Sequence, residues 1–104
     1  MSAGDVQSKL SAFCAEQGVY YNKIITSSKR GIPDVMIVVN GVTYWFEVKY
    51  GKDRLSAKQE EVIDKLNEHK EIAFVVKDFV DFITIYKELA EIKPVKPKEI
   101  KWSL

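Results

Sequence analysis

The chain has little of several things that would assign it to a class of proteins. Its single cysteine, Cys14, excludes an intrachain disulfide and is compatible with a reducing compartment. No apolar run approaches the roughly 18 residues that a membrane helix needs, and the polar N-terminus shows no signal peptide. The formal net charge is only +1, which neither indicates nor excludes nucleic-acid binding, because charge placement matters more than the sum. We therefore expect a cytoplasmic protein with no membrane partner.

Enough apolar material is nevertheless present for one compact domain. Hydrophobic residues make up 46% of the 104 residues and aromatic residues 12%. Apolar spacing and capping signals predict three helices, and β-branched runs predict four strands. The helices are expected at residues 5–17, at 57–69 and from 79 to the stop at Pro94, and the strands at 19–26, 34–39, 42–49 and 72–76. The expected fold is α/β, in the order α-β-β-β-α-β-α.

The most informative stretch runs from residue 33 to residue 49. Asn40-Gly41 separates its two apolar runs, and this dipeptide favours a type I′ hairpin turn. In such a hairpin Asp34 starts one strand and Glu47 ends the other, so the two carboxylates become neighbours. Lys49 points to the same face as Glu47, because side chains alternate along a strand. Two carboxylates and a lysine are thereby predicted to converge at one end of a small sheet.

This predicted cluster has the chemistry of a divalent-metal site, because carboxylate oxygens suit Mg²⁺ or Mn²⁺. Since Mg²⁺ keeps several waters, Asp34, Glu47 and the backbone carbonyl of Val48 are enough protein ligands. A metal so held activates water and neutralises charge on a phosphodiester, and Lys49 is expected to orient that water or to stabilise the developing charge. The alternative is an ordinary strand-end ion pair between Glu47 and Lys49, usually worth less than about 1 kcal/mol.

Three motifs occur together in an order that resembles a nuclease family. They are Gly31-Ile32-Pro33-Asp34, Phe46-Glu47-Val48-Lys49 and Leu55-Ser56-Ala57-Lys58-Gln59. Together they resemble the PD-(D/E)xK nucleases, and more closely the virus-type replication-repair nuclease (VRR-NUC) domain in its small stand-alone phage form. The resemblance covers a nuclease domain at residues 1–92 and leaves residues 93–104 as a basic tail that contains proline.

The resemblance implies a fold and an activity. The fold would be a restriction-endonuclease-like core, a mixed sheet flanked by helices. The activity would be metal-dependent hydrolysis of DNA phosphodiesters, in the cytoplasm of a bacterial host if a phage encodes the chain. Asp34 and Glu47 would be ligands, Lys49 the catalytic lysine and Gln59 a helper from the second helix. Gln59 can also cap that helix through the backbone of Ser56, and the two interpretations are not exclusive.

One feature of the family is altered in this chain. Many relatives have a glutamate early in the first helix, and counting back from Gly18 gives Gln7 at that position. The helix should run antiparallel to the first strand, which brings its N-terminus to the metal. Glu16 would then lie about 13 Å further along at 1.5 Å per residue. Gln7 is thus the candidate ligand, through its amide oxygen, and the lost charge should weaken a second metal site. The alternative is a routine polar residue.

Two polar, basic loops flank the predicted cluster and are expected to hold DNA phosphates, which needs no sequence information. They contribute Ser27, Ser28, Lys29, Arg30, Lys52 and Arg54. The alternative is that these loops are simply solvated. Trp45, on the strand face of Glu47, is interpreted as a core or interface residue rather than a base-stacking one.

We expect these features to form a structure-selective DNA endonuclease that acts on branched DNA such as a four-way junction. The alternative is a non-catalytic nucleic-acid-binding module that retains the nuclease fold, and the intact Asp34, Glu47 and Lys49 favour the enzyme. One metal centre cuts one strand at a time, so symmetric cleavage of a branch predicts a homodimer, as the family's stand-alone members also suggest. The candidate interface residues are Trp45, Phe79, Phe82, Tyr86 and Trp102.

Overall fold

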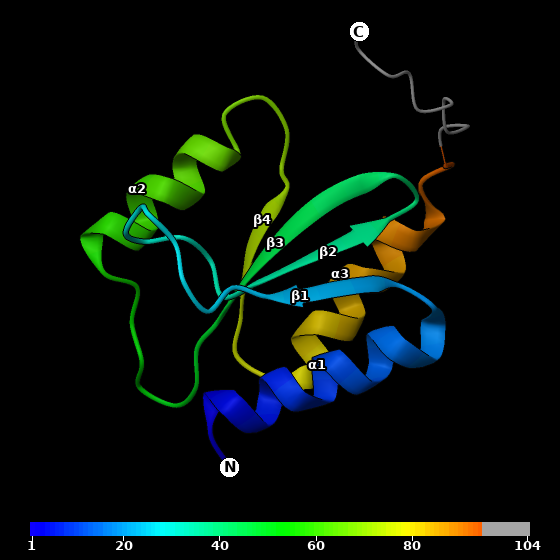
Figure 1. Ribbon diagram of the computed structural model, residues 1–104, viewed down its shortest axis with the longest axis horizontal. Helices are drawn as coiled ribbons and strands as arrows, with labels where there is room; N and C mark the ends of the chain where they lie inside the picture. The colour runs from blue at the N-terminus through cyan, green and yellow to red at the C-terminus, as the bar shows by residue number, and fades with distance from the viewer. Residues whose placement is uncertain (95–104) are drawn as a thin grey trace, which may run out of the picture.

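The computed structural model describes residues 1–94 as three helices and one four-stranded mixed sheet (Figure 1). The elements are α1 (Ala3–Gln17), β1 (Tyr20–Lys23), β2 (Val35–Val39), β3 (Val42–Val48), α2 (Ala57–Leu66), β4 (Ala73–Val76) and α3 (Phe79–Glu91). The strands lie in the order β1-β2-β3-β4. β1 pairs antiparallel with β2, and β2 pairs antiparallel with β3, whereas β3 and β4 are parallel. The predicted element order and the mixed sheet flanked by helices are confirmed.

The β2–β3 hairpin turns at Asn40 and Gly41, whose φ angles are both positive, at 49° and 82°. Two such residues in succession are what a type I′ turn requires, so this prediction is confirmed. The Asn40 side chain also donates hydrogen bonds to the carbonyls of Ala90, at 3.1 Å, and Ile92, at 2.8 Å. Carbonyls at the end of a helix have no partner within it. The turn therefore satisfies the end of α3 and ties the hairpin to that helix.

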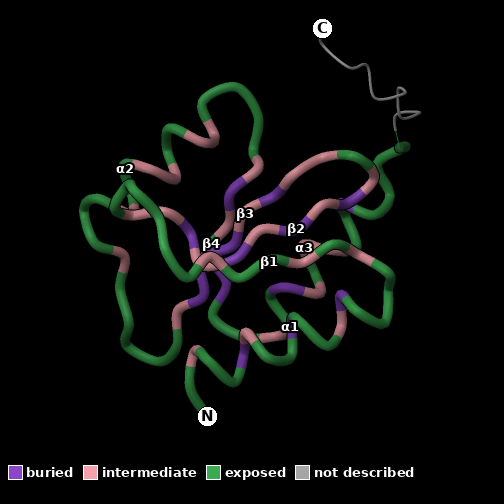
Figure 2. The backbone as a smooth tube through the Cα atoms, viewed as in Figure 1, coloured by how far each residue is buried: buried purple, intermediate pink, exposed green. Residues whose placement is uncertain are grey.

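One face of the sheet carries the hydrophobic core, which α1 and α3 cover (Figures 1 and 2). Alternate residues of β2 and β3 point into it. Its buried members include Val6, Leu10, Cys14, Val35, Ile37, Val39, Tyr44, Phe46, Val48, Val76, Phe82 and Leu89. Burying side chains of this size stabilises the fold by about 1.5–3 kcal/mol each before the entropy of ordering is subtracted.

An aromatic cluster joins α1 to α3 and corrects one prediction. Phe13 packs edge-on against Phe79, Phe82 and Tyr86, with ring centroids 5.8, 6.0 and 5.0 Å apart. Phe82 is completely buried within the monomer. Its proposed place in a dimer interface is therefore wrong, because the core of a single chain needs it. Phe79 and Tyr86 are half-buried in the same cluster.

Of the three helices in residues 1–94, α2 is the one on the other side of the sheet, and none of its residues is fully buried. The helix ends earlier than predicted, at Leu66 rather than near His69, because Asn67 caps it and binds the backbone of the following strand. Its Oδ1 accepts hydrogen bonds from the N–H groups of Ile72 and Ala73, both at 2.8 Å, and its Nδ2 donates to the Ala73 carbonyl. One side chain thus ends the helix and begins β4.

The boundaries of the first two elements also differ from the prediction. α1 begins at Ala3 because Ser2 is its N-cap, and Asp5, the predicted start, completes a capping box with it. β1 ends at Lys23 rather than near residue 26, although the next N–H, of Ile24, still donates to the Asp34 carbonyl at 2.7 Å. Within residues 1–94 no helix has the length and apolarity to cross a bilayer. Most of the predicted tail, with Trp102, lies outside the described residues.

Candidate active site

Asp34 and Glu47 are brought together by the register of the hairpin. Val35 pairs with Phe46, so one step outward Asp34 comes opposite Glu47. Side chains directly opposite each other share a face, and successive side chains alternate between faces. Because Val35 and Phe46 point into the core, both acids point to the other side of the sheet. Asp34 is also fixed there by its Oδ2, which accepts a hydrogen bond from the Val48 N–H at 3.0 Å.

Glu47 is a carboxylate buried with an incomplete set of partners. The residue is 2% exposed, and its Oε1 has no hydrogen-bond partner. Burial and the adjacent Asp34 raise the pKa of Glu47 to about 8, against the opposing effect of Lys49. Leaving a buried polar group unsatisfied costs about 1–3 kcal/mol. A ligand that contacted Oε1 would relieve this cost.

Lys49 is held at the same end of the sheet by its side chain and its backbone. Its Nζ lies 3.6 Å from Glu47 Oε2, and 16% of its side chain is exposed. Its backbone N–H donates to the Val76 carbonyl at 2.9 Å. The ion pair considered in the sequence analysis is therefore present. It keeps the ammonium group beside Glu47, at the boundary between the buried carboxylate and solvent.

Gln7 lies near the start of α1, the helix whose residues Val6, Leu10 and Cys14 pack into the core. Its Oε1 and that of Glu47 are the two buried side-chain N or O atoms in residues 1–94 that lack a hydrogen-bond partner. The Tyr21 hydroxyl of β1 donates to the Gln7 backbone carbonyl at 3.3 Å. Burial raises the pKa of Tyr21, and the charges of Cys14 and Asp34 raise it further. Asp34 is thus within electrostatic range of the hydroxyl that contacts Gln7.

The oxygen atoms at this end of the sheet fit a hard divalent cation. Asp34 and Glu47 supply carboxylates, and the unpartnered amide oxygen of Gln7 stays a predicted ligand. The Val48 carbonyl is a further candidate, because the N–H and C=O of a strand residue point to the same edge and this N–H points to Asp34. Among residues 1–94 no group of three His, Cys, Asp or Glu could hold a metal. Neutral oxygens and water would complete the ligand set, which Mg²⁺ tolerates.

Gln59 serves as a helix cap. Its Oε1 accepts a hydrogen bond from the Ser56 N–H at 2.9 Å, and Ser56 Oγ accepts one from the Gln59 N–H at 3.1 Å. This is the predicted capping box. Because the amide oxygen is occupied, a role for Gln59 in the active site would fall to its side-chain N–H groups and stays a prediction.

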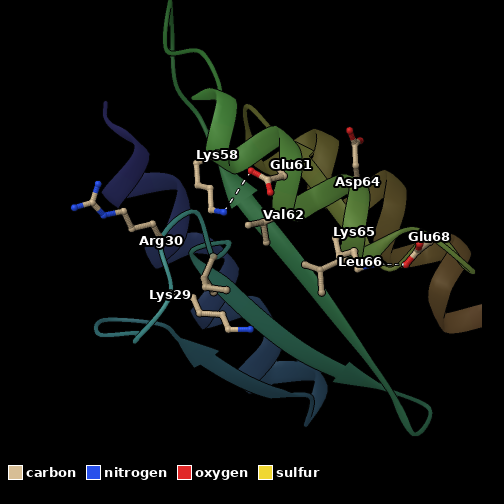
Figure 3. A pocket seen from close by; sticks show the side chains of 10 residues that line it. Lys29, Arg30, Lys58, Glu61, Val62, Asp64, Lys65, Leu66 and Glu68 are labelled. Carbon is tan, nitrogen blue, oxygen red and sulfur yellow. Dashed lines mark hydrogen bonds and ion pairs between the residues drawn. The ribbon is translucent and has the colours of Figure 1, made fainter.

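Four of the six predicted phosphate-binding residues line two separate grooves. Lys52 and Arg54 line a groove of about 850 Å³ together with Lys49. Lys29 and Arg30 line another, of about 890 Å³, between their loop and α2 (Figure 3). The lining of this second groove contains neither acid of the site nor Lys49. The two basic loops therefore do not share one groove, and phosphate binding by either stays a prediction.

The first basic loop is packed closely on α2. Gly31 has a φ of 78°, and a Cβ there would lie 2.8 Å from the Lys58 carbonyl oxygen. Only glycine allows both this conformation and this approach. Ser27 Oγ accepts a hydrogen bond from the Lys29 N–H at 3.2 Å, and Ser28 is exposed beside it. The loop that leads into Asp34 is thus positioned by the start of α2.

Comparison with known proteins decides the family. A model of the VRR-NUC domain matches residues 6–78 of the 104-residue chain. The chain belongs to the VRR-NUC family. The match runs from α1 through β4, so it includes Gln7, both acids and Lys49. Membership places this VRR-NUC domain among nucleases, with DNA as the implied substrate. No curated protein and no solved structure matches the chain.

Sequence reasoning misses two residues near the site of this VRR-NUC domain. Tyr21 contacts Gln7 across a sequence distance that no local pattern indicates. Lys77, directly after β4, lines the same groove as Lys49. The sequence does place Lys77 at the end of an apolar strand. This position indicates a neighbour of Lys49 only when β3 and β4 are parallel.

The raised pKa of Glu47 predicts how stability depends on pH. The folded protein holds this proton up to about pH 8, whereas the ordinary value is 4.5. The stabilisation is therefore complete below pH 4.5 and is lost as the pH rises to about 8. Metal-free wild type should lose a few kcal/mol relative to Glu47→Gln between pH 5 and pH 8, at about 1.4 kcal/mol per pKa unit.

Chemical denaturation of both metal-free proteins at the two pH values measures this difference. Comparing the two proteins removes the contribution of titrating groups that do not interact with Glu47. Parallel pH dependences would show that Glu47 does not hold its proton in the folded state.

Proposed function

We propose that this VRR-NUC domain is a Mg²⁺- or Mn²⁺-dependent endonuclease that hydrolyses DNA phosphodiesters, with selectivity for branched DNA. The observation that carries the proposal is the buried Glu47 beside Asp34, with one carboxylate oxygen unpartnered. An ion pair with Lys49 alone gives no reason for that oxygen to be both buried and free. A cation bound between the two carboxylates would account for it.

The proposed ligands are the carboxylates of Asp34 and Glu47, the Val48 carbonyl and the Gln7 amide oxygen. When bound, the metal would neutralise charge on the phosphodiester and lower the pKa of the attacking water. The Val48 N–H keeps one Asp34 oxygen in place, which leaves the other for the ligand. Because only two of the four groups are charged, the set balances one divalent ion, and a second would be bound weakly.

Lys49 is proposed as the catalytic lysine. From its position beside Glu47 the ammonium group can donate to the attacking water or to a non-bridging phosphate oxygen, whose negative charge grows in the transition state. Little of its side chain is exposed to water. Poor screening by solvent strengthens this stabilisation. Gln59 is proposed as a second donor from the start of α2.

DNA backbone contacts are proposed for both basic loops. One groove holds Lys52 and Arg54 beside Lys49, and the other holds Lys29 and Arg30, with Ser27 and Ser28 adjacent to it. Both grooves are also lined by residues of α2, Lys58 in one and Glu60 in the other. Two grooves that border one helix, each lined in part by basic side chains, offer places for two segments of DNA, which supports selectivity for a branch.

Replacing Lys49 tests the chemistry directly. Lys49→Ala should lower the single-turnover rate on a four-way junction by roughly 10²–10³, the cost of losing one transition-state donor, with little change in DNA affinity. Lys52→Ala should do the reverse, weakening binding and sparing the rate at saturation. Lys87→Ala, on the exposed side of α3, is the control for charge alone.

The same assay separates the proposal from its alternative. A protein that binds the junction but leaves it intact in Mg²⁺ and in Mn²⁺ would be a non-catalytic binding module. Cleavage that persists in excess chelator would show that the reaction does not need a divalent metal. If affinity fell as far as the rate in Lys49→Ala, this lysine would be a phosphate anchor.

We also propose a homodimer, because symmetric cleavage of a branch needs two sites at a fixed separation. Large apolar side chains remain exposed after the core has formed, with Tyr20, Ile25 and Val80 at 59%, 87% and 70% exposure. Sedimentation equilibrium at micromolar concentration should give twice the chain mass of 11.9 kDa. A mass of 11.9 kDa that does not rise with concentration would contradict the dimer.

A further inference from the structure

Lys77 lies beside Lys49 at the ends of two parallel strands. Val48 pairs with Val76 in the β3–β4 register, and the Lys49 N–H donates to the Val76 carbonyl at 2.9 Å. The next residue of each strand is a lysine. Neighbouring strands lie about 4.8 Å apart, and residues that pair in register share a face. The fold therefore sets two lysines side by side at the edge of the candidate site.

The groove around these two lysines collects further positive charge. Lys52 and Arg54 line it with them, and its acidic lining residues are Asp53 and Glu60. Asp53 is engaged locally, since its Oδ2 accepts a hydrogen bond from the Tyr50 N–H at 3.2 Å. Four cationic side chains thus face two acidic ones. The apolar lining residues are Leu55 and Val75, which is too little for an apolar ligand.

Lys77 has no carboxylate partner of its own among the described residues. The ion pairs there involve Lys49, Lys58, Lys65 and His69. The two nearest acids in sequence serve the start of α3 instead. Asp78 caps the helix by accepting the Asp81 N–H at 2.8 Å, and Asp81 accepts the Lys77 backbone N–H at 3.0 Å. The Lys77 backbone is thus fixed and its ammonium group is exposed to solvent.

Like charges side by side on neighbouring strands are destabilising. The Lys49 ammonium group lies 3.6 Å from Glu47 Oε2, whereas Lys77 is in none of the ion pairs formed within residues 1–94. An anion in the groove would turn this repulsion into attraction. Lys49, the proposed catalytic lysine, also lines this groove. The anion that fits the groove best is therefore another phosphate of the same DNA strand.

We propose that Lys77 forms a phosphate subsite, at which the DNA strand continues from Lys49 across the end of β4. Lys52 and Arg54 hold the strand from the opposite loop. The inference rests on the proposed function, since it concerns the path of the DNA that Lys49 acts on. It gives the strand a direction through the site, away from β2 and toward the open edge at β4.

The test compares Lys77→Gln with Lys87→Gln, an exposed lysine of α3 that lies in neither groove. Binding of a fluorescein-labelled 12-nucleotide single strand is followed by anisotropy in Ca²⁺, from 50 to 200 mM salt. One lost phosphate contact removes about 0.7 from the slope of log affinity against log salt. The affinity advantage of wild type over Lys77→Gln should therefore shrink about threefold over this range, while Lys87→Gln keeps the wild-type slope.

Thermal melting of the free variants supplies a readout that a purely structural lysine would not give. Lys77→Gln should melt no lower than wild type, because it removes repulsion between neighbouring lysines. An unchanged salt slope in Lys77→Gln, or a melting temperature that falls with the affinity, would overturn the subsite. If wild type itself neither bound nor cut DNA, the proposed function would fail instead, so the two failures are distinguishable.

Discussion

The pairing of β2 with β3 is set by the two-residue turn at Asn40 and Gly41, and the position of both acids follows from it. Side chains alternate with a period of two, so a slip by one residue would send every core residue of the strand to the other face. The buried partners Val35 and Phe46 prevent such a slip. The same register that fills the core therefore places Asp34 opposite Glu47. Asn40 reinforces it by anchoring the turn to the end of α3.

Burying the Glu47 carboxylate lowers the free energy of unfolding by a large fraction in a domain of this size. The effective cost of burying an ion is several kcal/mol, whereas small domains are stable by only about 5–15 kcal/mol in total. One ion pair at 3.6 Å does not satisfy both oxygens. Burial therefore favours the protonated form of Glu47 and raises its pKa to about 8. A bound divalent cation would replace this proton and would neutralise the buried charge of Glu47.

The hairpin could be predicted because its signals are local. Asn-Gly fixes the turn, and alternation fixes the faces, so Asp34, Glu47 and Lys49 follow from spacing alone. The ends of elements were harder, because distant groups decide them. Asn67 ends α2 through bonds to Ile72 and Ala73, which no helical pattern in the sequence contains.

Burial and groove lining depend on tertiary packing and could not be obtained from one sequence. The sequence alone allows Phe82 to lie in a dimer interface, but Phe13 of α1 packs against it and it is completely buried. Lys29 and Arg30 precede Asp34 in the chain, yet Gly31 lets their loop pack on α2, where they line a different groove. Lys77 could be linked to Lys49 only through the parallel register of β3 and β4.

If the free oxygen of Glu47 faces a divalent metal, anomalous diffraction from a crystal grown with Mn²⁺ will locate the ion beside it. One manganese peak is expected at about 2.1 Å from Glu47 Oε1 and from an Asp34 oxygen, a distance typical of hard six-coordinate cations. The Gln7 amide oxygen should lie in the same coordination sphere. A peak elsewhere, or a Glu47 Oε1 that instead accepts a hydrogen bond from the protein at full Mn²⁺ occupancy, would contradict it.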